Sequence, residues 1–118
     1  MIRRTALPLL ALLTTLAATH AGGWAVITVD ELPTDIVVGR PVTLNYSVRQ
    51  HGRTLLDGLR GSIEAQSAGQ AIREAASHGM DAGHYTVTFT LPRPGSWTIP
   101  IRSGFGNNQV TLLPVPVV

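Results

Sequence analysis

The stretch with the most metal-capable side chains runs from residue 76 to residue 85 and reads ASHGMDAGHY. It places His78, Met80 and His84 within seven residues, and Met80 is the only methionine besides Met1. Thioether and imidazole groups are ligands that suit Cu(I). The spacing therefore suggests a copper site on one turn. His78 and Met80 alone would hold the ion if His84 points elsewhere.

The residue patterns of common enzymes are absent from the sequence. It contains no G-x-S-x-G or H-E-x-x-H segment, no phosphate-binding loop, and no cysteine that could act as a nucleophile or a thiolate ligand. His51 and Asp57 are close in sequence, but nothing places a nucleophile beside them. The sequence therefore predicts that the protein is not an enzyme.

The first 21 residues have the layout of a secretory signal peptide. Arg3 and Arg4 precede an apolar run of 13 residues from Ala6 to Ala18, and a small residue, Ala21, precedes the expected cut. This run is shorter than the ~20 residues that span a bilayer as a helix. We expect a cleaved signal and a periplasmic or secreted domain over residues 22–118, with an uncleaved membrane anchor as the alternative.

The charge of the expected mature chain is balanced. The whole sequence has nine basic residues and seven acids, and two of the basic residues, Arg3 and Arg4, belong to the leader. The remaining charges are scattered, without the basic block that marks a nucleic acid or an anionic lipid as partner. The sequence therefore predicts no nucleic-acid partner, and membrane contact only through an uncleaved leader.

The apolar residues alternate with a period of two, which indicates strands and an all-β chain. In the clearest strand, Val42, Leu44, Tyr46 and Val48 share one face. The predicted strands cover residues 24–32, 42–49, 63–67, 70–76, 84–91, 96–101 and 109–115. These seven short strands with turn signals between them favour one domain, an immunoglobulin-like Greek-key β-sandwich.

Two connections are predicted in more detail. The strands over 84–91 and 96–101 flank the turn PRPG and are predicted to pair as a hairpin, with Trp97 as a buried structural residue. Pro100 has no amide donor, so the second of these strands is expected to have an edge or a bulge there. The apolar stretch with Leu55, Leu56 and Leu59 is expected to close one end of the core.

The segment DAGHY, residues 81–85, also has a structural interpretation. It resembles the tyrosine corner of immunoglobulin-type sandwiches, in which a tyrosine hydroxyl bonds the backbone just upstream. Asp81 would bond nearby amides, Gly83 would permit the turn, and Tyr85 would point inward. His84, next to Tyr85 in an extended strand, would then face solvent.

Two longer segments carry a family resemblance: VGRPVTLNYSVRQHG, from residue 38, and AGHYTVTFTLPRPGSWTIPIRSG, from residue 82. Over about residues 24–115 the chain resembles the FixH and YtkA-like families of exported immunoglobulin-like domains. FixH-type proteins are implicated, with a copper pump, in maturing a haem-copper respiratory oxidase, and many YtkA-like domains are suspected of handling copper. The resemblance implies an exported accessory protein that assists assembly of, or copper supply to, a membrane respiratory complex.

A competing hypothesis is an interaction or structural module with no metal role. In the segment SGFGNN, Phe105 lies between two glycines and is followed by Asn107. The ring is either exposed on a loop, where a protein partner could bind, or folded back as a lid on the core. Phe105 and Asn107 are therefore the candidate interaction residues.

Overall fold

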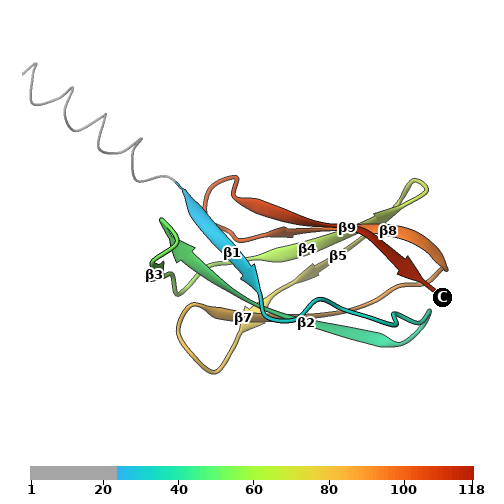
Figure 1. Cartoon of the computed structure of the whole chain (residues 1–118), viewed down its shortest axis with the longest axis horizontal. Coiled ribbons are helices and arrows are strands. Elements are labelled where there is room, and N and C mark those ends of the chain that lie inside the picture. The colour runs from blue at the N-terminus through green and yellow to red at the C-terminus, as the bar shows by residue number, and fades with distance from the viewer. Residues whose placement is uncertain (1–23) are drawn as a thin grey trace, which may run out of the picture.

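A computed structural model describes residues 24–118, and the predicted signal peptide lies outside the described residues. These residues form strands and turns only (Figure 1). The strands are β1 (Ala25–Val29), β2 (Pro41–Gln50), β3 (Thr54–Leu55), β4 (Ser62–Ser67), β5 (Gln70–Ala75), β6 (Ser77–His78), β7 (His84–Thr90), β8 (Gly95–Arg102) and β9 (Gln109–Val117).

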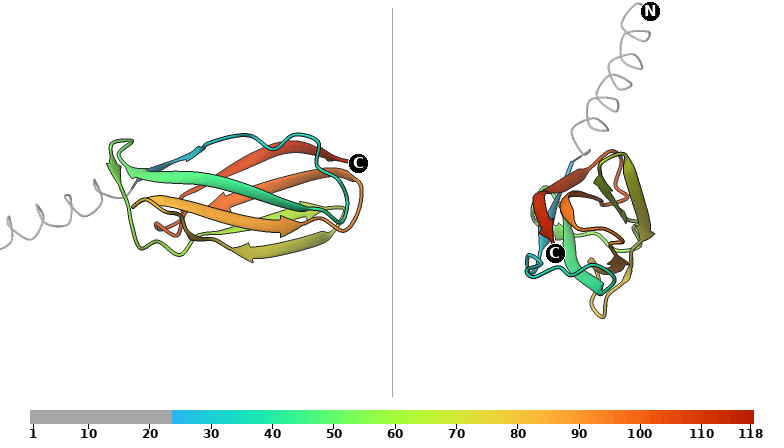
Figure 2. Two further views of the ribbon diagram at one scale, coloured as in Figure 1. Left: turned by 90° about the horizontal axis from the view of Figure 1, so that it is seen from below. Right: turned by 90° about the vertical axis from the view of Figure 1, so that its right-hand side faces the viewer.

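The strands form two antiparallel sheets around one interior (Figure 2). One sheet has the order β1-β2-β7-β6 with β3 added beside β2, and the other has the order β5-β4-β8-β9. These are the orders of strands A-B-E-D and C′-C-F-G in immunoglobulin sandwiches. The all-β, immunoglobulin-like fold prediction is confirmed, with two extra strands, β3 and β6, too short to leave an alternation in the sequence.

The core follows the alternation along each strand. On β2, Leu44, Tyr46 and Val48 are buried while their neighbours Thr43 and Asn45 are exposed. The buried apolar residues are Ala25, Ile36, Leu44, Tyr46, Val48, Ile63, Ala65, Tyr85, Val87, Phe89, Leu91, Trp97, Ile99, Ile101 and Val117. These residues come from both sheets, so the described strands enclose one hydrophobic core.

The predicted hairpin between the strands around residues 84–91 and 96–101 is wrong. β7 pairs with β2 and β6, whereas β8 pairs with β4 and β9, so the turn at residues 91–94 crosses from one sheet to the other. Alternation shows which side chains face inward, but two strands that face each other across a core have the same pattern as two that pair. The large inward side chains Phe89 and Trp97 fill the interior from opposite sheets.

The edge or bulge predicted at Pro100 of β8 is wrong in its place, because β8 lies between β4 and β9 and Pro100 itself pairs with Thr111. The ladder between β4 and β8 is interrupted opposite Pro100, which has no amide hydrogen to donate. On the other side of β8, Trp97 pairs with Val115 and Ile99 pairs with Leu112, so the extra residue is in β9. The bulge therefore lies on the edge strand rather than on β8 itself.

The sandwich has two ends, which are named here by the connections that form them. The N-terminal end consists of residues 51–61, 79–83 and 103–108, and the opposite end consists of residues 30–40, 68–69 and 91–94 with the C-terminus (Figure 1). Leu56 and Leu59 are half-buried against the core at the N-terminal end, as predicted, while Leu55 stays 39% exposed.

Candidate functional site

The candidate metal loop is the turn between β6 and β7. The Gly79 amide donates to the His84 carbonyl at 2.7 Å, and the His84 amide donates to the Asp81 carbonyl at 3.2 Å. Gly83 has a φ of 75°, which a type II turn requires at its third position and which glycine adopts without strain. A Cβ atom at Gly83 would also lie 2.7 Å from the Leu55 Cβ atom, so this position needs glycine for two reasons.

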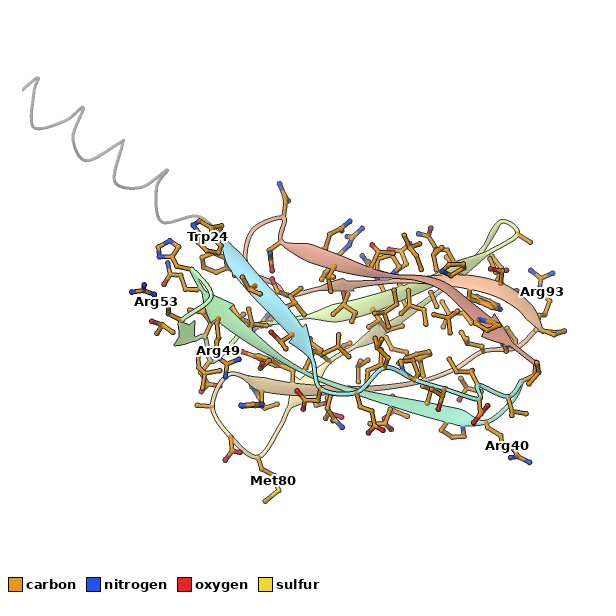
Figure 3. The ribbon with its side chains drawn as sticks, in the orientation of Figure 1. Trp24, Arg40, Arg49, Arg53, Met80 and Arg93 are labelled. Carbon is orange, nitrogen blue, oxygen red and sulfur yellow. The ribbon has the colours of Figure 1, made fainter. Side chains whose placement is uncertain are left out.

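The turn does not direct its three metal-capable side chains to one point. His78 pairs with Tyr85, and their ring centroids are 5.6 Å apart, so both side chains lie on the same face of the sheet. His84 is the neighbour of Tyr85 in a strand and projects to the opposite face. Met80 is fully exposed at the tip and points away from the sandwich (Figure 3). Within residues 24–118, no three histidine, cysteine, aspartate or glutamate side chains form a group that could hold a metal ion.

Asp57, which the sequence did not assign to any structural role, contacts the same turn. Its Oδ1 atom accepts a hydrogen bond from the Gly83 amide at 3.5 Å and lies 3.8 Å from His78 Nδ1. Both distances are long for hydrogen bonds, and both side chains are more than half exposed. Asp57 therefore links the turn to the β3–β4 connection, but these contacts add little to the free energy of unfolding.

Tyr85 makes the strong link between these two connections. Its hydroxyl donates to the Leu56 carbonyl at 2.5 Å and accepts from the Leu59 amide at 3.2 Å. The predicted tyrosine corner is wrong in its partner, because Tyr85 lies on β7, the equivalent of strand E, rather than on strand F. Its hydroxyl therefore crosses to the β3–β4 connection instead of returning to the adjacent backbone, and Asp81 stays exposed on the turn.

Tyr46 stacks beside Tyr85, with ring centroids 5.5 Å apart and an interplanar angle of 23°. Its hydroxyl is buried and has no hydrogen-bond partner. Burial, with a smaller contribution from the nearby Tyr85, raises the pKa of Tyr46 to about 12. One tyrosine of the pair is thus fully bonded, while the other keeps an unsatisfied polar group in the core.

The remaining predicted residues are placed as follows. Trp97 is fully buried, and its Nε1 donates to the Arg93 carbonyl at 3.0 Å. Phe105 is half-buried and packs against the core, which is the lid arrangement of the two alternatives. Asn107 is exposed.

Two polar residues that the sequence did not single out shape the loop around Phe105. Ser103 Oγ accepts from the Phe105 amide at 3.0 Å and donates to the Asn108 carbonyl at 3.3 Å. The Asn108 side-chain amide donates to the Ala25 carbonyl at 2.7 Å, which ties the loop to the start of β1. Serine and asparagine beside glycines often bond nearby backbone in turns, which is the one sequence signal for this role.

One surface hollow is lined by small and amide side chains only. A hollow of about 480 Å³ is lined by Gln66, Ser67, Ala68, Gly69, Gln70, Ala71, Ser96 and Thr98. None of these side chains is acidic or basic. Among the residues that the structure describes, no helix is long and apolar enough to cross a membrane.

The chain is similar to domains of an S-layer protein. It matches the crystal structure of the S-layer protein rSbsC(31-844) with a TM-score of 0.59 and 26% identity, covering 79% of this chain and 12% of that one. It matches the crystal structure of the S-layer protein SbsC domains 4 and 5 with a TM-score of 0.58 and 26% identity, covering 79% of this chain and 44% of that one. The chain thus spans less than half of either structure. No protein-family model matches the sequence, and no curated protein matches it.

Proposed function

We propose that this chain is a surface or secreted, non-catalytic β-sandwich module that acts through its surface as an interaction or structural subunit. The observation that carries this proposal is the similarity to S-layer protein domains over 79% of the chain. The divergent directions of His78, Met80 and His84 also favour it over a metal-handling role. The resemblance to the FixH and YtkA-like families, and the copper supply and respiratory complex that it implies, stay a prediction that these comparisons do not test.

The edge strand β9 is a suitable place for contact with another protein. It is nine residues long, and Leu113, in its bulge, is 66% exposed. Pro114 and Pro116 lack amide hydrogens, which makes β9 a poor template for an added strand. Contact here would therefore use side chains such as Leu113 rather than a continued sheet.

Photo-crosslinking in whole cells tests the proposed function. A photoreactive residue would replace Leu113 or Asn107 in the full chain, with a third variant at exposed Thr90, on the outer face of the other sheet, as the matched control. We expect discrete crosslinked species from Leu113 or Asn107, identified by mass spectrometry, and none from Thr90. A protein recovered only as an uncrosslinked monomer from all three variants would contradict the proposal.

A further inference from the structure

The N-terminal end exposes a group of apolar side chains at the start of β1. Trp24 is 50% exposed, Val26 is 40% exposed and Leu55 is 39% exposed. In the sheet register Val26 pairs with Arg49, and Arg49 pairs with Leu55. The side chains of Val26, Arg49 and Leu55 therefore form one row on the outer face of the sheet. Residues from three strands, far apart in sequence, thus meet at one place.

The turn between β2 and β3 extends this row. The ring of His51 lies 5.0 Å from the ring of Trp24, tilted by 45°, and the His51 amide donates to the Trp24 carbonyl at 3.3 Å. A Cβ atom at Gly52 would contact Val26 at 3.7 Å, so the turn lies directly against the row. We call Trp24, Val26, Arg49, His51, Arg53 and Leu55 the N-terminal patch.

The charges within the N-terminal patch have one sign, while the acidic Asp57 lies beside it, because Gly83 contacts both Asp57 Oδ1 and Leu55. Arg49 donates to the Ser47 hydroxyl at 3.0 Å, and neither Arg49 nor Arg53 takes part in an ion pair with another of the described residues. Arg49, Arg53 and Trp24 lie together at the end where the described chain begins (Figure 3). A patch of this composition attracts anions, and arginine matches phosphate groups in particular.

The shape of the patch differs from that of a protein-binding hot spot. Hot-spot aromatic residues usually fill well-packed pockets. Several hollows of the described surface are lined by residues outside the patch, for example residues 66–71 beside β8, residues 33–37 with 40–43, and Arg102 with residues 106–109. The N-terminal patch instead presents single apolar side chains flanked by arginines, which is the composition of segments that enter the membrane interface.

The position of the patch in the chain points the same way. Trp24 is the first described residue, and the sequence before it contains the apolar run from Ala6 to Ala18. A retained leader would hold the N-terminal patch close to the bilayer through only five intervening residues, and export through the membrane would release it there. Chain connectivity thus favours a lipid surface as the occupant.

We propose that the N-terminal patch docks on an anionic lipid surface. Trp24, Val26 and Leu55 enter the headgroup region, and Arg49 and Arg53 meet lipid phosphates. This inference goes beyond the proposed function and does not depend on it, because β9 and Asn107 take no part in the patch. It also differs from membrane attachment by an uncleaved leader, since it requires only residues 24–118.

Vesicle binding by residues 24–118, which form both sheets and the core between them, tests the proposal. The probe is a set of vesicles of phosphatidylcholine with or without phosphatidylglycerol. Of the two tryptophans, Trp97 is fully buried and Trp24 is half-exposed, so a change in emission on binding reports Trp24. We expect a blue shift and co-sedimentation with the anionic vesicles, both weakened by salt.

Paired variants separate the patch from general charge. Replacing both patch arginines, R49Q and R53Q, should weaken binding about 25-fold, since each arginine near an anionic surface contributes about fivefold. The matched control, R40Q with R93Q, removes the same charge at the opposite end (Figure 3) and should leave binding unchanged. Likewise W24S should abolish co-sedimentation, whereas L113S should not.

Three results would overturn the proposal. The first is no binding of wild-type protein to anionic vesicles at low salt. The second is an equal loss of binding in the R40Q/R93Q control, which would indicate nonspecific attraction. The third is crosslinking of the patch to a protein in cells without any vesicle binding, which would assign the patch to a protein partner. Crosslinks from Leu113 or Asn107 test the proposed function separately.

Discussion

The two ends of the sandwich are built differently, although the same strands run between them. At the N-terminal end, side chains bond one connection to another, as Tyr85 does to residues 56–59 and Asn108 does to the start of β1. Backbone bonds tie both ends, for example from the Val48 amide to the Gly83 carbonyl at the N-terminal end and from the Val38 amide to the Val118 carbonyl at the opposite end.

The glycines show the same contrast. At the opposite end, a Cβ atom added to Gly39, Gly69 or Gly95 would meet nothing within 4 Å. At the N-terminal end, a Cβ atom at Gly61, Gly79, Gly83 or Gly104 would press on neighbouring atoms, whereas one at Gly58 or Gly106 would meet nothing within 4 Å. The packed glycines at residues 61, 79, 83 and 104 therefore restrict the shape of the N-terminal end, whereas the glycines of the opposite end place no such restriction on it.

The largest difference in stability between the two ends is expected when one glycine at each end is replaced by alanine. Gly104 and Gly39 both have positive φ angles, 84° and 78°, so alanine has a similar backbone penalty of about 1 kcal/mol at each. Only at Gly104 would the new methyl group also lie 2.6 Å from a backbone oxygen, that of Arg60. We expect G104A to destabilise the fold by about 3 kcal/mol and G39A by about 1 kcal/mol, measured by urea unfolding. Equal losses would remove the contrast between the ends.

The next largest change in stability is expected from removing the hydroxyl of either stacked tyrosine, Tyr85 or Tyr46, beneath the N-terminal end. Y85F removes a hydroxyl that bonds both Leu56 and Leu59, and we expect a loss of about 2 kcal/mol. Y46F removes a buried hydroxyl that has no partner, so we expect no loss or a small gain in stability. Urea unfolding of the two variants beside wild type measures both. A larger loss in Y46F than in Y85F would reverse this assignment.

The raised pKa of Tyr46 predicts how stability changes in alkali. Its pKa is about 12 in the folded protein, compared with about 10 in an unfolded chain. The unfolded state releases this proton first, so the contribution of Tyr46 is complete below about pH 10 and is lost as the pH rises toward 12. The chain has no lysine, so tyrosine is the side-chain type that titrates there.

The measurement is the free energy of unfolding at about pH 9 and about pH 11.5. Between these values wild type should lose up to about 2 kcal/mol more than Y46F does. Y46F serves as the control for wild type, because it lacks only the Tyr46 hydroxyl and keeps Tyr85 and the rest of the chain. The same alkaline loss in both proteins would place the titrating group elsewhere.

The smallest effect is expected from the candidate metal ligands, which are also at the N-terminal end. Because His78, Met80 and His84 point in different directions, the H78A/M80A double variant should bind Cu(I) no more weakly than wild type does. Competition with a Cu(I) chelator measures both affinities, and H84A serves as a matched histidine loss. A strong loss of affinity in the double variant alone would restore the two-ligand copper site.

Much of the fold followed from the sequence, because alternation reports directly which side of a strand is buried. The inward face of β2 and the closure of the core by Leu56 and Leu59 were predicted from residue types and spacing, whereas the bulge predicted at Pro100 lies in β9 instead. The pairing of the strands around Phe89 and Trp97 was not, since facing and paired strands share one pattern. Two-residue strands such as β6 also give no periodic signal.

The candidate site was less predictable, because its contacts join segments far apart in the chain. Asp81 is next to the turn in sequence, yet Asp57 makes the side-chain bond to Gly83. The partner of Tyr85 could not be found before its strand was assigned to the correct place in the sheet. The arginines looked scattered until the register of β1, β2 and β3 brought Arg49 between Val26 and Leu55.

By itself, the sequence determined that the chain is an all-β sandwich and which residues fill its core, since burial of alternate apolar side chains is a local property of a strand. Only the tertiary structure decided which strands pair, which backbone groups Tyr85 bonds, and which exposed side chains gather into the N-terminal patch. Those outcomes depend on register and on sheet crossing, which are set by the fit of the whole core rather than by any single segment.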